Sequence, residues 1–153
     1  MKIMDILVRD AVILNLGVRT KREVLAEMAA ALAKVEPQIE ADRLLEVLEE
    51  REALQSTGIG EGVAIPHGKL AGLDRLVASF ARSAEGVDFD SIDGQLTRHF
   101  FLLVVPEHSG GKYLKALARI SRFFRDPTFR QLLNDSESLE DVVRTIEEED
   151  AKL

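Results

Sequence analysis

Residues 99–105 read His-Phe-Phe-Leu-Leu-Val-Val, and this run decides the fold class. Aromatic and β-branched side chains dominate it, which is typical of a strand. A strand with one solvated face would alternate polar and apolar residues, so a run this uniform is expected to be buried on both faces. We therefore predict that 99–105 is a central strand of a sheet.

Helical patterns lie on both sides of this strand. Thr20 and Glu23 form a capping box, after which apolar residues recur at helical spacing until Pro37 breaks the run. Asp126-Pro127 gives a second clear stop signal. The helices expected from these patterns are 20–35, a second one ending near Arg51, 113–124, 128–133 and a last one starting near 138.

Shorter apolar runs predict the remaining strands, at 12–14, 63–65 and 76–81. Asp93-Gly94 marks a turn between the later strands. Helices and strands alternate only loosely and include hairpin turns. The expected fold is therefore α/β with a mixed sheet and helices on both faces, rather than a purely parallel doubly wound fold.

The composition fits one domain. The chain has 153 residues, 46% of them hydrophobic, which is enough to bury a core without disulfides or metal. We expect a single domain over 1–153, with a core of about 3–148. The acidic end 147–150, Glu-Glu-Glu-Asp, is expected to be a solvated, frayed helix terminus.

Charge, cysteine content and apolar run length limit the possible settings. A net charge of −7 without a dense basic stripe argues against nucleic-acid binding. The absence of cysteine is compatible with a reducing cytosol and rules out a cysteine-based metal site. No apolar run is long enough to span a membrane or form a signal peptide. We expect a cytoplasmic protein without membrane insertion.

One segment carries the chemistry: Ser56–Gly68, which reads STGIGEGVAIPHG. Gly58, Gly60 and Gly62 can adopt conformations closed to other residues, so the loop can curl and turn N–H groups toward an anion. Pro66 fixes the backbone beside His67. A neutral imidazole whose one N–H is held by a carbonyl keeps the other nitrogen free to attack phosphorus. The alternative is that His67 is a turn residue with no chemical role.

The longer stretch 52–70, EALQSTGIGEGVAIPHGKL, resembles the active-site segment of the type-2 (mannitol/fructose/nitrogen-regulatory) enzyme IIA family of the bacterial phosphotransferase system. The resemblance extends to Arg51, to the 89–94 turn and to the stretch 99–125. It implies an α/β sandwich with a mixed, about five-stranded sheet. It also implies that His67 accepts a phosphoryl group from a phosphorylated carrier protein resembling HPr and passes it on.

The resemblance assigns a phosphate contact to Arg51, whose guanidinium can donate paired hydrogen bonds to phosphate oxygens. The residues alone instead favour an interaction of Arg51 with the last carbonyls of its helix. Ser56 and Thr57 could donate hydroxyl protons to the phosphate, with Thr57 the tentative choice, or could cap the following turn.

Tyr113 stands where many members of the family carry a second histidine beside the active one. Its hydroxyl can donate a hydrogen bond to His67 or to the phosphate, but the ring cannot become cationic. This departure puts in doubt the transfer rate and the substrate branch. Ordinary packing is the alternative for Tyr113. We interpret His108 as a solvated loop residue and His99 as a structural one.

No metal or cofactor is expected. The three histidines are far apart in a chain without cysteine, and no H-x-x-x-H pattern occurs. Glycines 58, 60 and 62 lack the dinucleotide-binding spacing and the Gly-Lys-Ser/Thr ending of a P-loop.

The motif and the family resemblance leave three candidate functions. The favoured one is a regulatory, nitrogen-type IIA that controls partners such as transporters or kinases through its phosphorylation state. The glycine-histidine run and the lack of a fused IIB, IIC or carrier domain favour it. The second is a sugar-specific IIA that passes phosphate to a IIB subunit for fructose or mannitol. The third is a binding module that has lost phosphotransfer.

Overall fold

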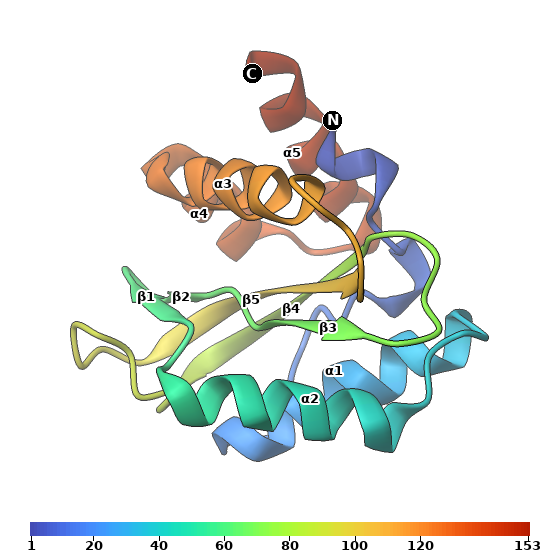
Figure 1. Ribbon diagram of the computed structural model, residues 1–153. Coiled ribbons are helices and arrows are strands. Elements are labelled where there is room, and N and C mark those ends of the chain that lie inside the picture. Colours follow the sequence, from blue (N-terminus) through green and yellow to red (C-terminus); the bar gives the residue numbers. More distant parts are fainter.

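The computed structural model describes residues 1–153, and a mixed five-stranded sheet forms its middle layer (Figure 1). The strands are β1 (Gly58–Gly60), β2 (Val63–Ala64), β3 (His67–Leu70), β4 (Val77–Val87) and β5 (Thr97–Pro106). β5 lies at the centre: β4 pairs with it antiparallel along one edge, and β2 and β3 pair with it parallel along the other. The predicted mixed sheet and the central place of 99–105 are confirmed.

Helices cover both faces of this sheet, as predicted (Figure 1). On one face lie α1 (Lys21–Val35) and α2 (Ala41–Leu54). On the other lie α3 (Lys112–Arg125), α4 (Pro127–Asp135) and α5 (Leu139–Lys152). Two short 3-10 turns, η1 (Ile3–Asp5) and η2 (Arg9–Ala11), precede α1. None of the helices combines the length and the apolar character needed to cross a membrane.

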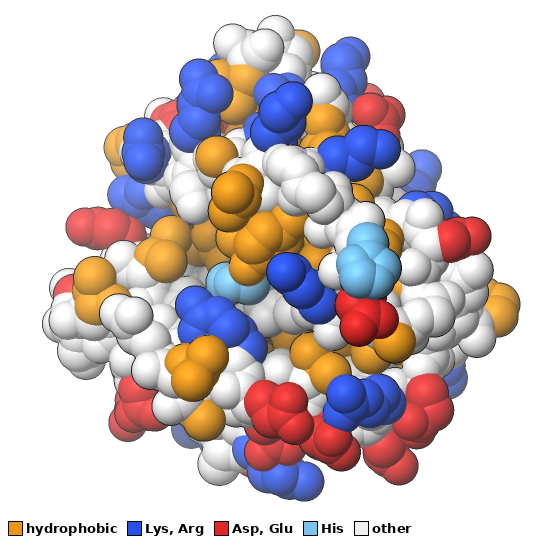
Figure 2. All heavy atoms as spheres, viewed as in Figure 1, with side chains coloured by type: hydrophobic (Ala, Val, Ile, Leu, Met, Phe, Trp, Pro, Cys, Tyr) orange, Lys and Arg blue, Asp and Glu red, His pale blue; other side chains and the backbone are white.

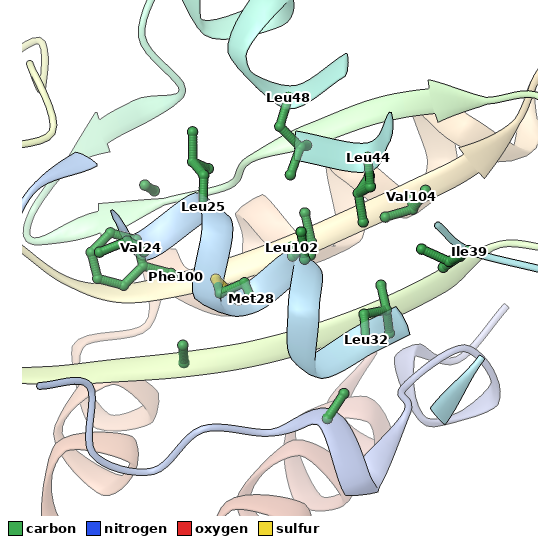
Figure 3. Packing of buried hydrophobic residues seen from close by; sticks show 14 of the residues in the cluster. Val24, Leu25, Met28, Leu32, Ile39, Leu44, Leu48, Phe100, Leu102 and Val104 are labelled. Carbon is green, nitrogen blue, oxygen red and sulfur yellow. The ribbon is translucent and has the colours of Figure 1, made fainter. Parts of the chain in front are cut away.

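β5 joins the two layers because its side chains alternate between them. Phe100, Leu102 and Val104 belong to the buried cluster beneath α1 and α2 (Figure 3). Phe101, Leu103 and Val105 belong to the cluster beneath α3, α4 and α5. All six are fully buried. Burial of each such side chain contributes about 1.5–3 kcal/mol, so this strand holds both helical layers in place.

The helix ends follow the signals in the sequence, with one difference. Thr20 caps α1: its hydroxyl accepts a hydrogen bond from the Glu23 amide at 3.2 Å, and the Glu23 carboxylate accepts one from the Thr20 amide. Helix α2 ends at Leu54, not near Arg51. Nothing between Arg51 and Leu54 breaks a helix. Arg51 and Glu52 therefore lie inside the last turn of α2.

The prediction of a strand at 12–14 was wrong. This segment follows η2 and meets the free edge of β4 only at an isolated bridge between Ile13 and Ala81. The Ile13 amide donates to the Phe80 carbonyl at 2.9 Å, while Val12 and Leu14 pack against the core beneath α3, α4 and α5. Apolar residues here cover a sheet edge without extending the sheet.

The acidic end is also not the frayed terminus that we expected. Glu149 and Asp150 are buried, at 6% and 4% exposed. The Asp150 carboxylate accepts hydrogen bonds from the Ile3 and Met4 amides at 3.0 and 2.9 Å, and it pairs with Arg119 of α3 at 3.0 Å. A carboxylate with three charge-assisted or backbone donors tolerates burial. Asp150 thus fastens the C-terminal helix to the N-terminal turn.

Candidate functional site

His67 begins β3 directly after a break in one edge of the sheet. β2 and β3 follow one another along this edge of β5, with Ala64 beside Phe100 and His67 beside Leu103. Pro66 lies in the break, where it has no amide to contribute, and its carbonyl accepts a hydrogen bond from the Leu103 amide at 2.9 Å. The residues before and after His67 are therefore both held by the central strand β5.

Gly68 brings helix α2 close to the histidine. A Cβ atom at this position would lie 2.6 Å from Cγ1 of Val47, well inside van der Waals contact. Only glycine lets α2 pack directly on β3 at this point. The last turn of α2, with Arg51 and Glu52, is thereby placed beside His67.

The imidazole of His67 is held in one orientation. Its side chain is buried, with the residue 8% exposed, and Nδ1 lies 2.8 Å from the Ile65 carbonyl oxygen. A carbonyl can only accept, so in the neutral ring Nδ1 carries the proton and Nε2 keeps its lone pair. Burial lowers the pKa of His67, and the Arg51 charge lowers it further, against opposing effects of the Ile65 bond and Glu52. The ring is therefore neutral near pH 7.

An open pocket of about 330 Å³ lies over His67. Its walls come from the end of α2, the 55–59 segment, the 91–93 loop and one side of α3. The lining residues are Arg51, Gln55, Ser56, Thr57, Gly58, Ile59, Ile65, His67, Ile92, Leu117 and Ser121. A larger hollow of about 510 Å³ adjoins it through Ile59 and Ser121, and its lining includes Arg125 and Arg130 but no histidine.

Hydrophobic side chains surround this pocket on the molecular surface. Ile59 and Ile92, which line the pocket, are 44% and 73% exposed. Figure 2 shows that hydrophobic side chains gather in the middle of this face, with a histidine deep among them. Lys and Arg lie mainly above, over α3, and Asp and Glu mainly below, along α2. An exposed apolar patch with a charged rim is typical of a protein-docking surface.

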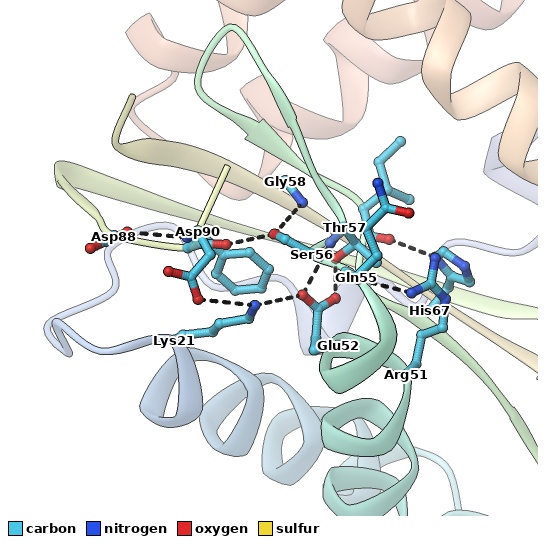
Figure 4. A network of polar contacts seen from close by, with 12 residues as sticks. Lys21, Arg51, Glu52, Gln55, Ser56, Thr57, Gly58, His67, Asp88 and Asp90 are labelled. Carbon is cyan, nitrogen blue, oxygen red and sulfur yellow. Dashed lines mark hydrogen bonds and ion pairs between the residues drawn. The ribbon is translucent and has the colours of Figure 1, made fainter. Parts of the chain in front are cut away.

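Arg51 lies in the His67 pocket and also interacts with its own helix end. Its guanidinium donates a hydrogen bond to the Gln55 carbonyl at 2.9 Å, beside His67 in Figure 4. This is the helix-end interaction that the residues alone allowed. A guanidinium has five N–H donors, so the others stay available to an anion in the pocket.

The hydroxyls of Ser56 and Thr57 organise the loop. Thr57 donates its hydroxyl proton to Glu52, and its amide donates to the same carboxylate at 3.0 Å. Ser56 donates to the Phe89 carbonyl at 2.6 Å and accepts from the Gly58 amide at 3.0 Å. Each hydroxyl has one proton, which is already committed. The capping alternative describes Ser56, and the Thr57 hydroxyl faces a carboxylate rather than offering its proton to a phosphate.

We expected the glycine segment to curl and point its N–H groups toward an anion, but it forms a hairpin instead. β1 and β2 form a hairpin whose tip, Gly60-Glu61-Gly62, has φ values of +95°, +57° and +75°. The Gly62 carbonyl accepts from the Arg98 and His99 amides, and the Glu61 amide donates to Asp93. Two glycines thus serve the turn and its attachment to β5. Of the three, only Gly58 lines the His67 pocket.

Of the other candidate side chains, Tyr113 lies beside His67, whereas His108 and His99 do not. Tyr113, in the first turn of α3, lies with its ring centroid 5.7 Å from that of His67, at an interplanar angle of 56°. Lys69 lies over the Tyr113 ring, with its Nζ 5.8 Å from the ring centroid. His108 is exposed in the turn before α3. His99 is buried in β5, away from the His67 pocket.

This geometry agrees with a comparison against protein families. Residues 5–149 match the family described as "Phosphoenolpyruvate-dependent sugar phosphotransferase system, EIIA 2". The chain belongs to the type-2 EIIA family. The resemblance seen in residues 52–70 is confirmed, and it covers nearly the whole chain.

Individual relatives come from two branches of the type-2 EIIA family. The chain is 43% identical over 136 residues to a nitrogen regulatory protein of Bradyrhizobium diazoefficiens, covering 89% of this chain and 88% of the relative. It is 34% identical to the fructose-specific EIIABC component of Bacillus subtilis, spanning 98% of this chain but only 24% of that longer protein. A fructose-specific EIIA component of Haloferax volcanii is 35% identical over 78% of this chain and 76% of the relative.

Solved structures of EIIA proteins give the same fold. The crystal structure of nitrogen regulatory protein IIA-Ntr from Neisseria meningitidis superposes with a TM-score of 0.87 at 34% identity, covering 93% of this chain and 97% of that one. Mannitol IIA from Escherichia coli superposes with a TM-score of 0.76 at 19% identity, covering 91% and 97%, and at that identity it supports the fold alone.

One residue of this EIIA site was missed by sequence reasoning. Glu52 was quoted only as part of the motif, yet its buried carboxylate binds both Thr57 and Lys21. The presence of a carboxylate in the last helical turn, five residues before a threonine, was a usable local signal. The contact with Lys21, 31 positions away, had no signal in the sequence.

Proposed function

We propose that this EIIA protein is a cytoplasmic phosphohistidine carrier of nitrogen-regulatory type, and that His67 is the phosphorylated residue. The observation that carries the proposal is the Nδ1 contact with the Ile65 carbonyl, which leaves Nε2 as a neutral nucleophile in an open pocket. A carrier protein resembling HPr would be the donor. Its phosphohistidine can enter the pocket once the apolar rim is docked.

The transfer step needs no cofactor to balance. The Nε2 lone pair of His67 attacks the phosphorus of the donor's phosphohistidine, in line with the departing nitrogen. The donor P–N bond breaks and its electron pair returns to the donor imidazole. The proton stays on Nδ1 of His67, which donates it in a hydrogen bond to the Ile65 carbonyl. That carbonyl stabilises the positive charge that develops on the ring.

Arg51 is the residue that we propose for holding the phosphoryl oxygens, with Tyr113 as a tentative second donor. Arg51 lines the same pocket, its charge already acts on His67, and most of its N–H donors are free. Tyr113 approaches from α3 and could donate its hydroxyl. We do not assign phosphate binding to Thr57, because its hydroxyl proton is given to Glu52.

The similarity to nitrogen regulatory proteins favours a regulatory role. Phosphorylation would add a charge of about −1.5 to −2 in the middle of the apolar patch around the pocket, to which Ile59 and Ile92 belong. A partner that docks on this patch would meet an anion in one state and an apolar surface in the other. Such a change can switch which proteins bind, including transporters or kinases.

Similarity to fructose-specific EIIA proteins supports a second candidate, a sugar-specific subunit that passes the phosphoryl group to a IIB protein. The two roles share the chemistry at His67 and differ only in the acceptor. The two roles can therefore be distinguished by identifying the protein that accepts the phosphoryl group from His67.

The test is acid-labile phosphorylation measured by intact mass. The purified chain is incubated with enzyme I, an HPr-like carrier and phosphoenolpyruvate, beside a His67→Ala variant. We expect one added phosphate that is absent from the variant. Rapid loss of that phosphate to a fructose IIB protein would favour the sugar-specific role. No phosphate with any carrier would contradict the proposal and leave a binding module as the better account.

A further inference from the structure

Glu52 is a buried carboxylate whose bonding is complete. Its side chain is 5% exposed, and its oxygens accept hydrogen bonds from the Thr57 amide at 3.0 Å and from the Thr57 hydroxyl. Lys21, the first residue of α1, adds an ion pair at 3.0 Å (Figure 4). Burying a carboxylate is costly unless donors surround it, and here three do. The carboxylate therefore holds Thr57 in one place.

Thr57 in turn holds the residue that orients His67. The Thr57 carbonyl accepts a hydrogen bond from the Ile65 amide at 3.0 Å. The carbonyl of the same Ile65 accepts from His67 Nδ1 at 2.8 Å. Ile65 is thus clamped through its amide while its carbonyl fixes the ring. An unbroken chain of contacts leads from Glu52 through Thr57 and Ile65 to the imidazole.

The far side of Glu52 ties this chain to another segment. Lys21 also lies 3.6 Å from the Asp90 carboxylate and over the Phe89 ring, 4.8 Å from its centroid. Ser56 donates to the Phe89 carbonyl from the other side. The 56–58 segment is therefore braced from α1, α2 and the 88–90 loop together, rather than by its own turn alone.

We propose that Glu52, supported by Lys21, is a positioning residue that keeps His67 in its Nδ1–H tautomer with Nε2 free. Which imidazole nitrogen carries the proton is set by the hydrogen bond that it makes, so loosening Ile65 releases the tautomer. The consequence for phosphoryl transfer rests on the function proposed above. The consequence for the tautomer does not depend on that function.

The experiment uses the full chain and reads the tautomer without any donor protein. Nitrogen-15 NMR of the ring is recorded for the wild type, Glu52→Ala and Glu52→Gln, above the His67 titration. We expect a single Nδ1–H form in the wild type and a mixture of tautomers in Glu52→Ala. Gln keeps an acceptor for the Thr57 amide, so Glu52→Gln should restore most of the wild-type signal.

Phosphorylation rates are measured on the same proteins. Residues that orient metal-binding histidines typically change activity by about 10–100-fold when mutated. By analogy we expect a fall of about that size in Glu52→Ala and a much smaller one in Glu52→Gln. Glu49→Ala is the matched control, because Glu49 lies one turn earlier on α2 and pairs with Arg22 at 2.8 Å, away from the 56–58 segment. It should change neither reading.

Two further variants keep the test open if Glu52→Ala does not fold. Thr57→Val removes only the hydroxyl link and should also mix the tautomers, whereas Thr57→Ser should not. An unchanged Nδ1–H tautomer in folded Glu52→Ala, or in Thr57→Val where Glu52→Ala fails to fold, would overturn the positioning role. A wild type that shows the tautomer but accepts no phosphate would instead contradict the proposed function and leave the positioning role intact.

Discussion

The starts of β3 and β5 each bury a histidine, but the two rings lie in opposite chemical settings. His67 has a carbonyl partner for Nδ1, an arginine beside it and a pocket over it. His99 lies against the faces of Phe80 and Phe124, with centroids 6.0 and 6.3 Å away, and neither of its nitrogens has a hydrogen-bond partner. Burial alone therefore does not identify the histidine that we propose as the phosphoryl acceptor.

The environment of each ring explains the difference. Burial and the charges of three nearby arginines lower the pKa of His99 to about 4, so the ring stays neutral, and both of its nitrogens are buried without a hydrogen-bond partner. The pKa of His67 is also lowered, but the ring keeps one oriented N–H and lies in the same pocket as Arg51, which we propose as the phosphate-binding residue. A nucleophile needs an orienting partner and room for its substrate as well as a neutral ring.

The largest expected effect comes from removing the arginine beside His67, and removal of an arginine near His99 provides the comparison. Arg51→Gln should slow phosphorylation of His67 by about 100-fold, as loss of one transition-state donor does in other enzymes. Arg130→Gln, which removes a guanidinium near His99, should change the rate by less than about 3-fold. Initial rates with a phosphorylated carrier measure both. Equal losses in the two variants would erase the distinction between the two sites.

The second prediction concerns stability against pH. His99 has a pKa of about 4 in the folded chain and about 6.5 when unfolded, so the unfolded state binds the extra proton between these values. Stability should therefore be complete above about pH 6.5 and fall by about 3 kcal/mol as the pH approaches 4. His99→Phe should lose that part of the pH dependence. Urea unfolding at several pH values tests it.

At neutral pH, His99→Phe should be neutral or stabilising, because it removes two unpartnered nitrogens from between aromatic rings. A His67→Gln variant should keep the His99 part of the pH dependence. If His99→Phe retained the wild-type pH profile, His99 would not be the titrating group.

The third prediction tests the close packing of helix α2 on β3 beside His67. Gly68→Ala places a methyl group against Val47 and should destabilise the chain by about 1–3 kcal/mol. Gly17→Ala is the control, since a Cβ there meets nothing within 4 Å. Adding Val47→Ala should recover part of the loss. Thermal unfolding of the four proteins would show whether α2 and β3 touch as described.

The smallest effect is expected at Tyr113. Tyr113→Phe keeps the ring beside His67 and removes only the hydroxyl, so the transfer rate should fall by no more than about 3-fold. A fall of 10-fold or more would show that the hydroxyl contacts the transferred group. The rate assay used for Arg51 decides between these outcomes.

Local patterns were enough to predict most of the fold. The central strand could be predicted from 99–105 because composition alone distinguishes a strand buried on both faces. The cap at Thr20 depends on residues three apart, which a sequence displays directly. Gly60 and Gly62 of the motif adopt positive φ, as predicted, whereas Gly58 does not. Their use in a hairpin was decided by pairing with β5, which local preference cannot specify.

The parts that escaped prediction depend on distant partners. Asp150 was expected to be solvated, and nothing near it in the sequence announces the Ile3 amide or Arg119. Likewise, the position of Arg51 beside His67 follows from the packing of α2 on β3 and could be anticipated only through the family resemblance. Non-local pairs are invisible to periodicity and spacing.

The contact between Asp150 and the Ile3 amide brings the two ends of the described chain together, on the side of the sheet that carries α5 (Figure 1). Because the ends nearly meet, a short linker could join them into a continuous loop. New ends could then open in the exposed turn at Ala71-Gly72, where the backbone has free space. Such a circular permutant would keep every strand beside its present neighbour while changing the order in which the chain visits them.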